Sequence, residues 1–146
     1  MYATIAWCTT YFSTVLNVEP WTEATDAERT AALTMATDAI DRLNFLGEKT
    51  DSSQTNQFPR DADTIVPEDI QKASAEIALR LLDGVDPEIE FEQLGMVSQG
   101  YANVRSTYDR SQPPPHIVAG IVSITAWRFL KPYLRDWRGV KVNRVS

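Results

Sequence analysis

The stretch that decides the fold is "VPEDIQKASAEIALRLLDG", residues 66–84. A proline opens it, two carboxylates follow in the first turn, and a glycine closes it, which are typical start and stop signals of a helix. Between these signals, apolar side chains recur three and four positions apart, at Ile70, Ala73, Ile77 and Leu81. This spacing predicts an amphipathic helix with one buried face.

Two further helices are predicted on the N-terminal side of this stretch. Residues 25–47 begin with Thr25 and Glu28, which have the spacing of a capping box. A buried stripe follows at Leu33, Ala36, Ile40 and Leu43. Apolar residues at helical spacing from Ile5 predict a shorter helix that runs to about Leu16 and is broken by "NVEPW".

The remaining segments are less regular. Residues 48–66 are polar and aperiodic, which predicts a long loop of the kind that is often functional or mobile. Residues 94–108 carry β-branched and aromatic side chains around Ser98-Gln99-Gly100, which favours a β-hairpin or an extended loop. Residues 116–130 are apolar on all sides, which predicts one buried helix that Pro132 ends or kinks.

These segments predict a mainly α protein, a small bundle of four to five helices. Residues 1–134 form the predicted helical domain and residues 135–146 an extended C-terminal arm. With 146 residues, 43% of them hydrophobic, the chain is long enough for one domain with its own core. No stretch has the length and apolarity of a membrane span or a secretory signal, so no membrane partner is expected.

The sequence offers little that would support chemistry. Cys8 and His116 are the only cysteine and histidine, so one chain can form neither a disulfide nor a Cys/His zinc site. The glycines build no phosphate-binding or dinucleotide motif. We therefore expect no enzyme, no cofactor and no metal. A small hydrolase using His116 is the alternative, but capping or a surface position is the commoner role for a lone histidine.

The end of the chain differs in charge from the rest. Residues 131–146 hold five basic residues and one acidic residue, a net charge of +4, so the other residues carry −10 of a total of −6. The acidic body argues against DNA as the main ligand. The favoured interpretation of the end is an arm that docks on an acidic partner, and the alternative is a frayed, solvated terminus. The residues expected to make the contact are Trp137, as apolar anchor, with Arg138, Val140, Lys141, Val142 and Arg144.

The order of the segments resembles a known family. An N-terminal "ATIAWCTTYF" is followed by "WTEATDAERTAALTMATDAIDRL", then by "QFPRD" within the long loop, then by the helix of residues 66–84. This pattern, over residues 3–84, resembles the small head-to-tail connector (adaptor, or head completion) proteins of tailed bacteriophages. Relatives of that family are often labelled DnaT-like single-stranded-DNA-binding proteins.

The resemblance implies a structural virion protein. It would form a dodecameric ring at the phage neck, join the portal to the tail or to the next neck protein, and let genomic DNA pass through its channel without sequence-specific binding. Separately, the net charge of −10 on residues 1–130 leads to the hypothesis that carboxylates line this channel and repel the DNA phosphates. The arm would contact the portal, and Phe58, Pro59 and Arg60 would lie in a contact loop between subunits or with the neck. The protein would be found in the virion and, during assembly, in the host cytoplasm.

The alternative function is a single-stranded-DNA-binding accessory protein. Such proteins need aromatic side chains beside a basic groove, on which bases can stack. The residues that come nearest to this requirement are Trp127, Arg128, Tyr133, Trp137 and Arg138.

Overall fold

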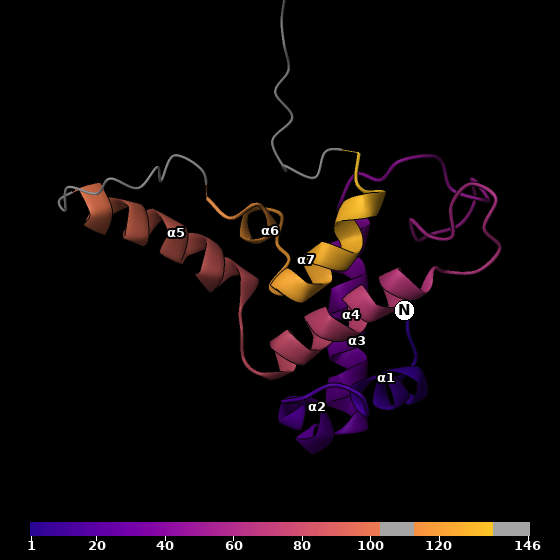
Figure 1. The fold of residues 1–146 in the computed structure, drawn as a ribbon, viewed down its shortest axis with the longest axis horizontal. Helices are drawn as coiled ribbons and strands as arrows, with labels where there is room; N and C mark the ends of the chain where they lie inside the picture. The colour runs from indigo at the N-terminus through magenta and orange to yellow at the C-terminus, as the bar shows by residue number, and fades with distance from the viewer. Residues whose placement is uncertain (103–112, 136–146) are drawn as a thin grey trace, which may run out of the picture.

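The computed structural model describes residues 1–102 and 113–135, with side chains for residues 1–94 and 113–135 (Figure 1). This part of the chain is mainly helical, as predicted, and its only β-features are two isolated bridges. None of its helices is both long and apolar enough to cross a membrane. The helices are α1 (Ile5–Phe12), α2 (Glu19–Glu23), α3 (Asp26–Asp41), α4 (Glu68–Leu82), α5 (Pro87–Ala102), α6 (Pro115–Val118) and α7 (Ile124–Leu130), followed by the 3₁₀ turn η1 (Lys131–Tyr133).

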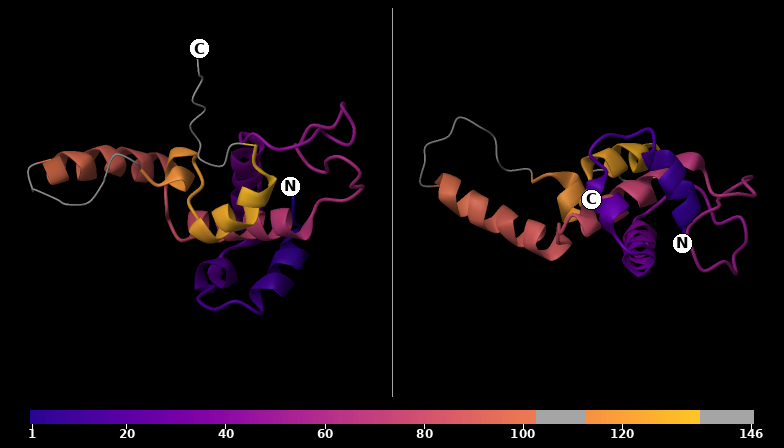
Figure 2. Two further views of the ribbon diagram at one scale, coloured as in Figure 1. Left: turned by 45° about the horizontal axis from the view of Figure 1, so that its top comes forward. Right: turned by 90° about the horizontal axis from the view of Figure 1, so that it is seen from below.

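Helix α4 lies at the centre of the bundle. It packs against α3 and α7, with smaller contacts to α1 and α2 (Figures 1 and 2). Every residue from 73 to 79 is buried, including Ser74 and Glu76, so the middle of α4 is covered all round instead of on one face. The Tyr11 hydroxyl of α1 donates a hydrogen bond to Glu76 at 2.8 Å, which provides a partner for this buried carboxylate.

Helix α3 begins at the predicted cap and ends at Asp41, earlier than the predicted end near Gly47. Thr25 accepts a hydrogen bond from the Glu28 amide at 3.2 Å and its own amide donates to the Glu28 carboxylate at 2.7 Å, so the capping box is confirmed. Helix α1 is shorter than predicted and ends at Phe12, with Asn17 in the left-handed region at φ 60° a few residues later. A short helix that the sequence did not predict, α2, begins within the "NVEPW" break and buries Trp21.

The β-hairpin predicted at residues 94–108 is wrong for residues 94–102, because α5 continues to Ala102. Residues 103–108 lie outside the part described. The start of α5 explains the error: Pro87 stands in the first turn, Glu88 and Glu90 complement the helix dipole, and Asp86 accepts a hydrogen bond from the Glu88 amide at 2.9 Å. These signals for a helix outweigh the weak turn signal of the following residues. Helix α5 extends away from the α3–α4–α7 bundle and packs against α6 (Figure 1).

The single helix predicted over residues 116–130 is also wrong, since the structure has two short helices there. Gly120 adopts φ 82°, a conformation that favours glycine, and this turn ends the α6 region. Ser123 then caps α7, because its hydroxyl accepts a hydrogen bond from the Ala126 amide at 3.1 Å. Pro132 lies in η1, directly after α7, so its predicted effect on the helix is confirmed.

Candidate functional site

A hollow of about 620 Å³ lies where the segment after α3 meets the end of η1. Its walls include three arginines and two amide side chains, whereas no carboxylate lines it. Its floor is apolar and includes Phe45 and Trp127. We call it the arginine hollow, and its polar residues are Arg42, Asn44, Gln57, Arg60 and Arg135.

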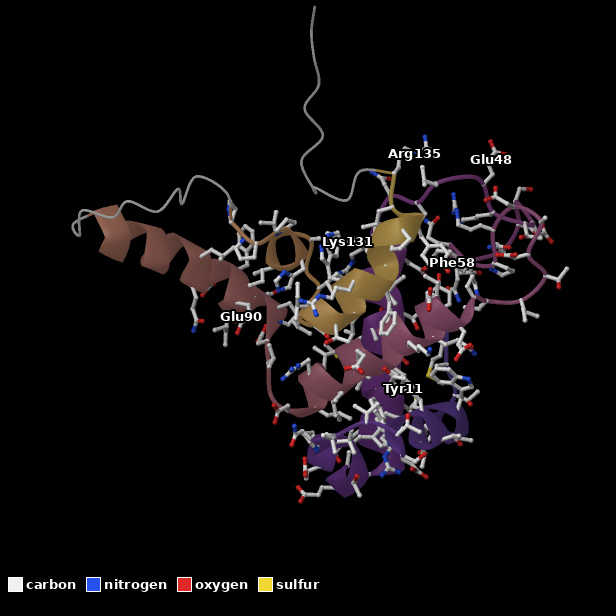
Figure 3. All side chains as sticks on the ribbon, in the orientation of Figure 1. Tyr11, Glu48, Phe58, Glu90, Lys131 and Arg135 are labelled. Atoms are coloured by element: carbon white, nitrogen blue, oxygen red, sulfur yellow. The ribbon has the colours of Figure 1, made fainter. Side chains whose placement is uncertain are left out.

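Backbone pairing between residues 44–46 and residues 133–135 brings two distant parts of the chain together at this hollow. Phe45 and Leu134 form an isolated antiparallel bridge. On either side of it, the Leu46 amide donates to the Tyr133 carbonyl at 2.8 Å and the Arg135 amide donates to the Asn44 carbonyl at 3.0 Å. This pairing fixes Arg135 next to the segment that follows Arg42. Figure 3 shows Arg135 at the same end of the molecule as Phe58.

Arg60 forms the inner wall, and its guanidinium binds several oxygens of the loop. Nε donates to the Leu46 carbonyl at 2.9 Å, Nη2 to the Gly47 carbonyl, and Nη1 to the Gln57 carbonyl and the Gln57 side-chain oxygen at 3.2 and 2.9 Å. Only 9% of Arg60 is exposed, and no ion pair with a carboxylate is found for it among the described residues. Arg60 therefore places a buried positive charge, paired only with neutral oxygens, behind the hollow.

Phe58 supports the same wall from the core. Its ring makes edge-to-face contacts with Tyr2, Phe45 and Tyr133 at centroid distances of 6.0, 4.6 and 5.7 Å. The Tyr2 hydroxyl accepts a hydrogen bond from the Gln57 amide at 2.9 Å and donates to the Asp41 carboxylate. Burial, together with this carboxylate, raises the pKa of Tyr2 above its ordinary value. The phenol thus stays protonated and keeps the loop attached to α3.

The predicted contact loop therefore lies mostly inside the subunit. Phe58 and Arg60 are buried and Pro59 is half-buried. Their role in contacts between subunits or with the neck remains a prediction, and the contacts described above are within one chain.

The rim of the hollow carries free positive charge. Arg42 and Arg135 are both exposed, and neither side chain has a hydrogen bond or an ion pair within the described residues. Arg29 and Lys72 differ, because each pairs with a carboxylate of its own helix, Asp26 and Glu68. The hollow is thus a local positive site on a chain whose net charge is −6.

The residues that the sequence suggested for base stacking and for the arm do not form one site in the described part of the chain. Trp127 is 3% exposed and contributes to the floor of the hollow, so its ring offers no open face of the kind on which bases stack. Tyr133 is half-buried, and its ring makes an edge-to-face contact with Phe58. Arg128 is exposed on α7. The predicted arm residues, from Trp137 to Arg144, lie outside the described residues.

His116 lies in α6 beside a small cavity of about 60 Å³ that Glu90 also lines. Burial lowers the pKa of this imidazole, while the charge of Glu90 opposes the shift. Within the side chains that the structure describes, no group of three or more His, Cys, Asp or Glu residues is placed to hold a metal ion.

Sequence reasoning missed the hollow as a site. Arg42 and Gln57 lie in stretches that carry the family resemblance but were given no role there, Asn44 belongs to no motif, and Arg135 entered only as the first residue of the arm. Two signals pointed toward the region without defining it: the long polar loop before α4 and the change of charge near the end of the chain.

Comparison with known proteins gives one result that covers nearly the whole chain. The family model described as "Putative DnaT-like ssDNA binding protein" matches residues 1–144. Comparisons with curated proteins and with solved structures gave no match. The family match includes the bundle, both walls of the arginine hollow and the basic end of the chain. The chain therefore belongs to the family of putative DnaT-like single-stranded-DNA-binding proteins.

Proposed function

We propose that the protein is a non-enzymatic accessory protein that binds single-stranded DNA through the phosphates of the strand. The observation that carries the proposal is the arginine hollow, where an acidic chain gathers three arginines without a carboxylate. Arginine binds phosphate well because its planar guanidinium presents paired donors. Neutralising phosphates also releases condensed counterions, which supplies most of the affinity of nonspecific nucleic-acid binding.

The acidic body does not prevent such binding. At physiological salt the Debye length is about 8 Å, so carboxylates farther than this from the hollow are largely screened from a bound phosphate. Residues 135–146 contain four basic residues and one acidic residue, so the sequence adds positive charge directly after the rim residue Arg135. The aromatic rings of the hollow are recessed, so the phosphates supply the affinity and the base sequence has little influence.

Fluorescence anisotropy with a labelled single-stranded oligonucleotide tests this proposal. Affinity should fall steeply as salt rises, by a slope of about 0.7 in log K per log salt for each phosphate contact. The double variant Arg42→Gln/Arg135→Gln should bind more weakly and with a shallower slope. Arg80→Gln removes an exposed charge from α4, outside the hollow, and serves as the matched control. Equal loss of affinity in both variants, or no binding even at low salt, would refute the role of the hollow.

A second candidate function is favoured by a different feature. Helix α5 extends from the bundle with Ile89 and Phe91 51% and 55% exposed, and such apolar side chains are suited to contacts in an assembly. This agrees with a subunit of a dodecameric ring at a phage neck, which would join the portal to the next neck or tail protein, carry the genomic DNA in its channel, and be found in the virion after assembly in the host cytoplasm.

Mass photometry, with and without a cognate portal ring, tests the second function. A ring subunit should assemble on the portal, and Phe91→Ser should reduce this assembly while leaving the circular dichroism spectrum of the monomer unchanged. A chain truncated after Leu134 tests whether the predicted arm, Trp137 to Arg144, makes the portal contact. If the intact chain stays monomeric and unbound in the presence of the portal, the connector function is excluded.

A further inference from the structure

The shape of the arginine hollow indicates which phosphate of a nucleic-acid strand it can bind. We infer that the hollow is an end site, which binds the terminal phosphate of a single-stranded nucleic acid in preference to an internal phosphodiester. This inference rests on the proposed function, single-stranded-DNA binding, and narrows its ligand.

The floor of the hollow is built from the core of the subunit. Phe45, Trp127 and Leu134 are 4%, 3% and 6% exposed, so the hollow is closed underneath and no strand can thread through the subunit there. An internal phosphate carries a sugar on each side, and both sugars would have to fit beside it in the hollow. A terminal phosphate carries only one, so it can reach farther toward the floor and closer to Arg60.

The charge of the hollow fits a terminal phosphate better than an internal one. A phosphate monoester carries about −1.5 to −2 charges at pH 7, since its second pKa is about 6, whereas a diester carries one. The three arginines supply positive charge that no carboxylate lining the hollow offsets. The buried charge of Arg60 gains more from a dianion than from a monoanion, because burial lowers the local dielectric and weakens screening.

The inner wall is already ordered for such a ligand. Four of the five guanidinium N–H groups of Arg60 are engaged by oxygens of Leu46, Gly47 and Gln57, which fixes the plane of the side chain and leaves one N–H on Nη2. Asn44 is exposed on the rim and brings an amide donor. Arg42, Asn44 and Arg135 would have to be ordered on binding, whereas Arg60 is already fixed and adds no further entropic cost.

The test compares the full-length chain with one oligonucleotide prepared in three forms: with a 5′-phosphate, with a 3′-phosphate and with hydroxyls at both ends. The fluorophore stands at an internal position in all three. We expect the dissociation constant of one of the phosphorylated forms to be at least fivefold lower than that of the form with hydroxyls at both ends. This preference should shrink as the pH falls below about 6, where the monoester becomes a monoanion. It should disappear in Arg42→Gln/Arg135→Gln and persist in Arg80→Gln.

The possible failures can be told apart. Equal binding of all three forms by the wild-type chain would overturn the end site and leave single-stranded-DNA binding standing. Absence of binding to any form would overturn the proposed function as well. Competition with inorganic phosphate distinguishes a strand end from a free anion. If low millimolar phosphate abolishes the preference for the phosphorylated oligonucleotide, and the oligonucleotide binds no more tightly than inorganic phosphate, the hollow is a site for small anions. That result would overturn the end site.

Discussion

Replacing Arg60 by lysine should cost far more stability than the same change at Arg42, although both residues line the arginine hollow. The Arg60 fork binds three carbonyls and one amide oxygen, and lysine keeps the charge but can reach one or two of these four acceptors. Removing a hydrogen bond from a charged donor costs about 1.5–3 kcal/mol, and losses within one cluster are not additive. We therefore expect Arg60→Lys to lower the free energy of unfolding by about 2–4 kcal/mol.

Urea unfolding at 25 °C, followed by tryptophan fluorescence, measures this loss. Trp21 and Trp127 are both buried and should report on the bundle. The control, Arg42→Lys, changes an exposed side chain that has no partner within the described residues, so its effect should stay within about 0.5 kcal/mol. The denaturant slope should be the same for all three proteins. If Arg60→Lys and Arg42→Lys have equal stability, the fork does not hold the loop and the account of the inner wall is wrong.

Three further changes test the core and the caps. Thr25→Ala should cost about 1 kcal/mol in urea unfolding through loss of the capping box, whereas Thr34→Ala, in the exposed middle of α3, should cost much less. Phe58→Ala should cost about 3–5 kcal/mol, because it leaves a cavity among three aromatic rings; a loss below about 1 kcal/mol would contradict the packing. Burial raises the pKa of Cys8 from 9.0 to about 12, so the thiol contributes stability that is complete below pH 9 and is lost as the pH rises toward 12. At pH 8.5, iodoacetamide should therefore modify Cys8 roughly a thousandfold more slowly in the folded chain than in urea, and comparable rates would show that the thiol is not buried.

The helices that local signals define could be predicted from the sequence. Thr25 and Glu28 are three residues apart and bond each other, and Pro67 and Gly84 mark the limits of α4 within a residue or two. Both signals act within one or two turns, so no knowledge of the remaining chain is needed. The burial of every residue from 73 to 79 in α4 could not be predicted in this way, because it depends on which other helices cover the second face.

The errors lie where local signals conflict. In α5 the helix start at Pro87 outweighs the turn-like sequence Ser98-Gln99-Gly100. At Gly120 one backbone conformation divides an apolar stretch whose pattern predicts a single helix. The arginine hollow depends on Arg42 and Arg135, which are far apart in the sequence and meet through the bridge at Phe45. No spacing rule links such residues. The position of the candidate site was therefore harder to predict from the sequence than the positions of the helices.

The way in which Arg60 binds both ends of the polar loop has a practical consequence for engineering the protein. The Arg60 side chain binds the carbonyls of Leu46 and Gly47, so it holds the start of the loop next to Arg60. The geometry of these two loop ends therefore does not depend on the loop tip between Gly47 and Arg60. Doubling the length of a closed loop costs only about 0.6 kcal/mol. A peptide tag inserted between the exposed Ser52 and Ser53 would disturb the hydrogen bonds that Asp51 makes with Ser53 and Gln54, and it would leave the contacts of Arg60 in place. The loop tip is thus a site for attaching a probe or an affinity handle that leaves the basic chain end unmodified.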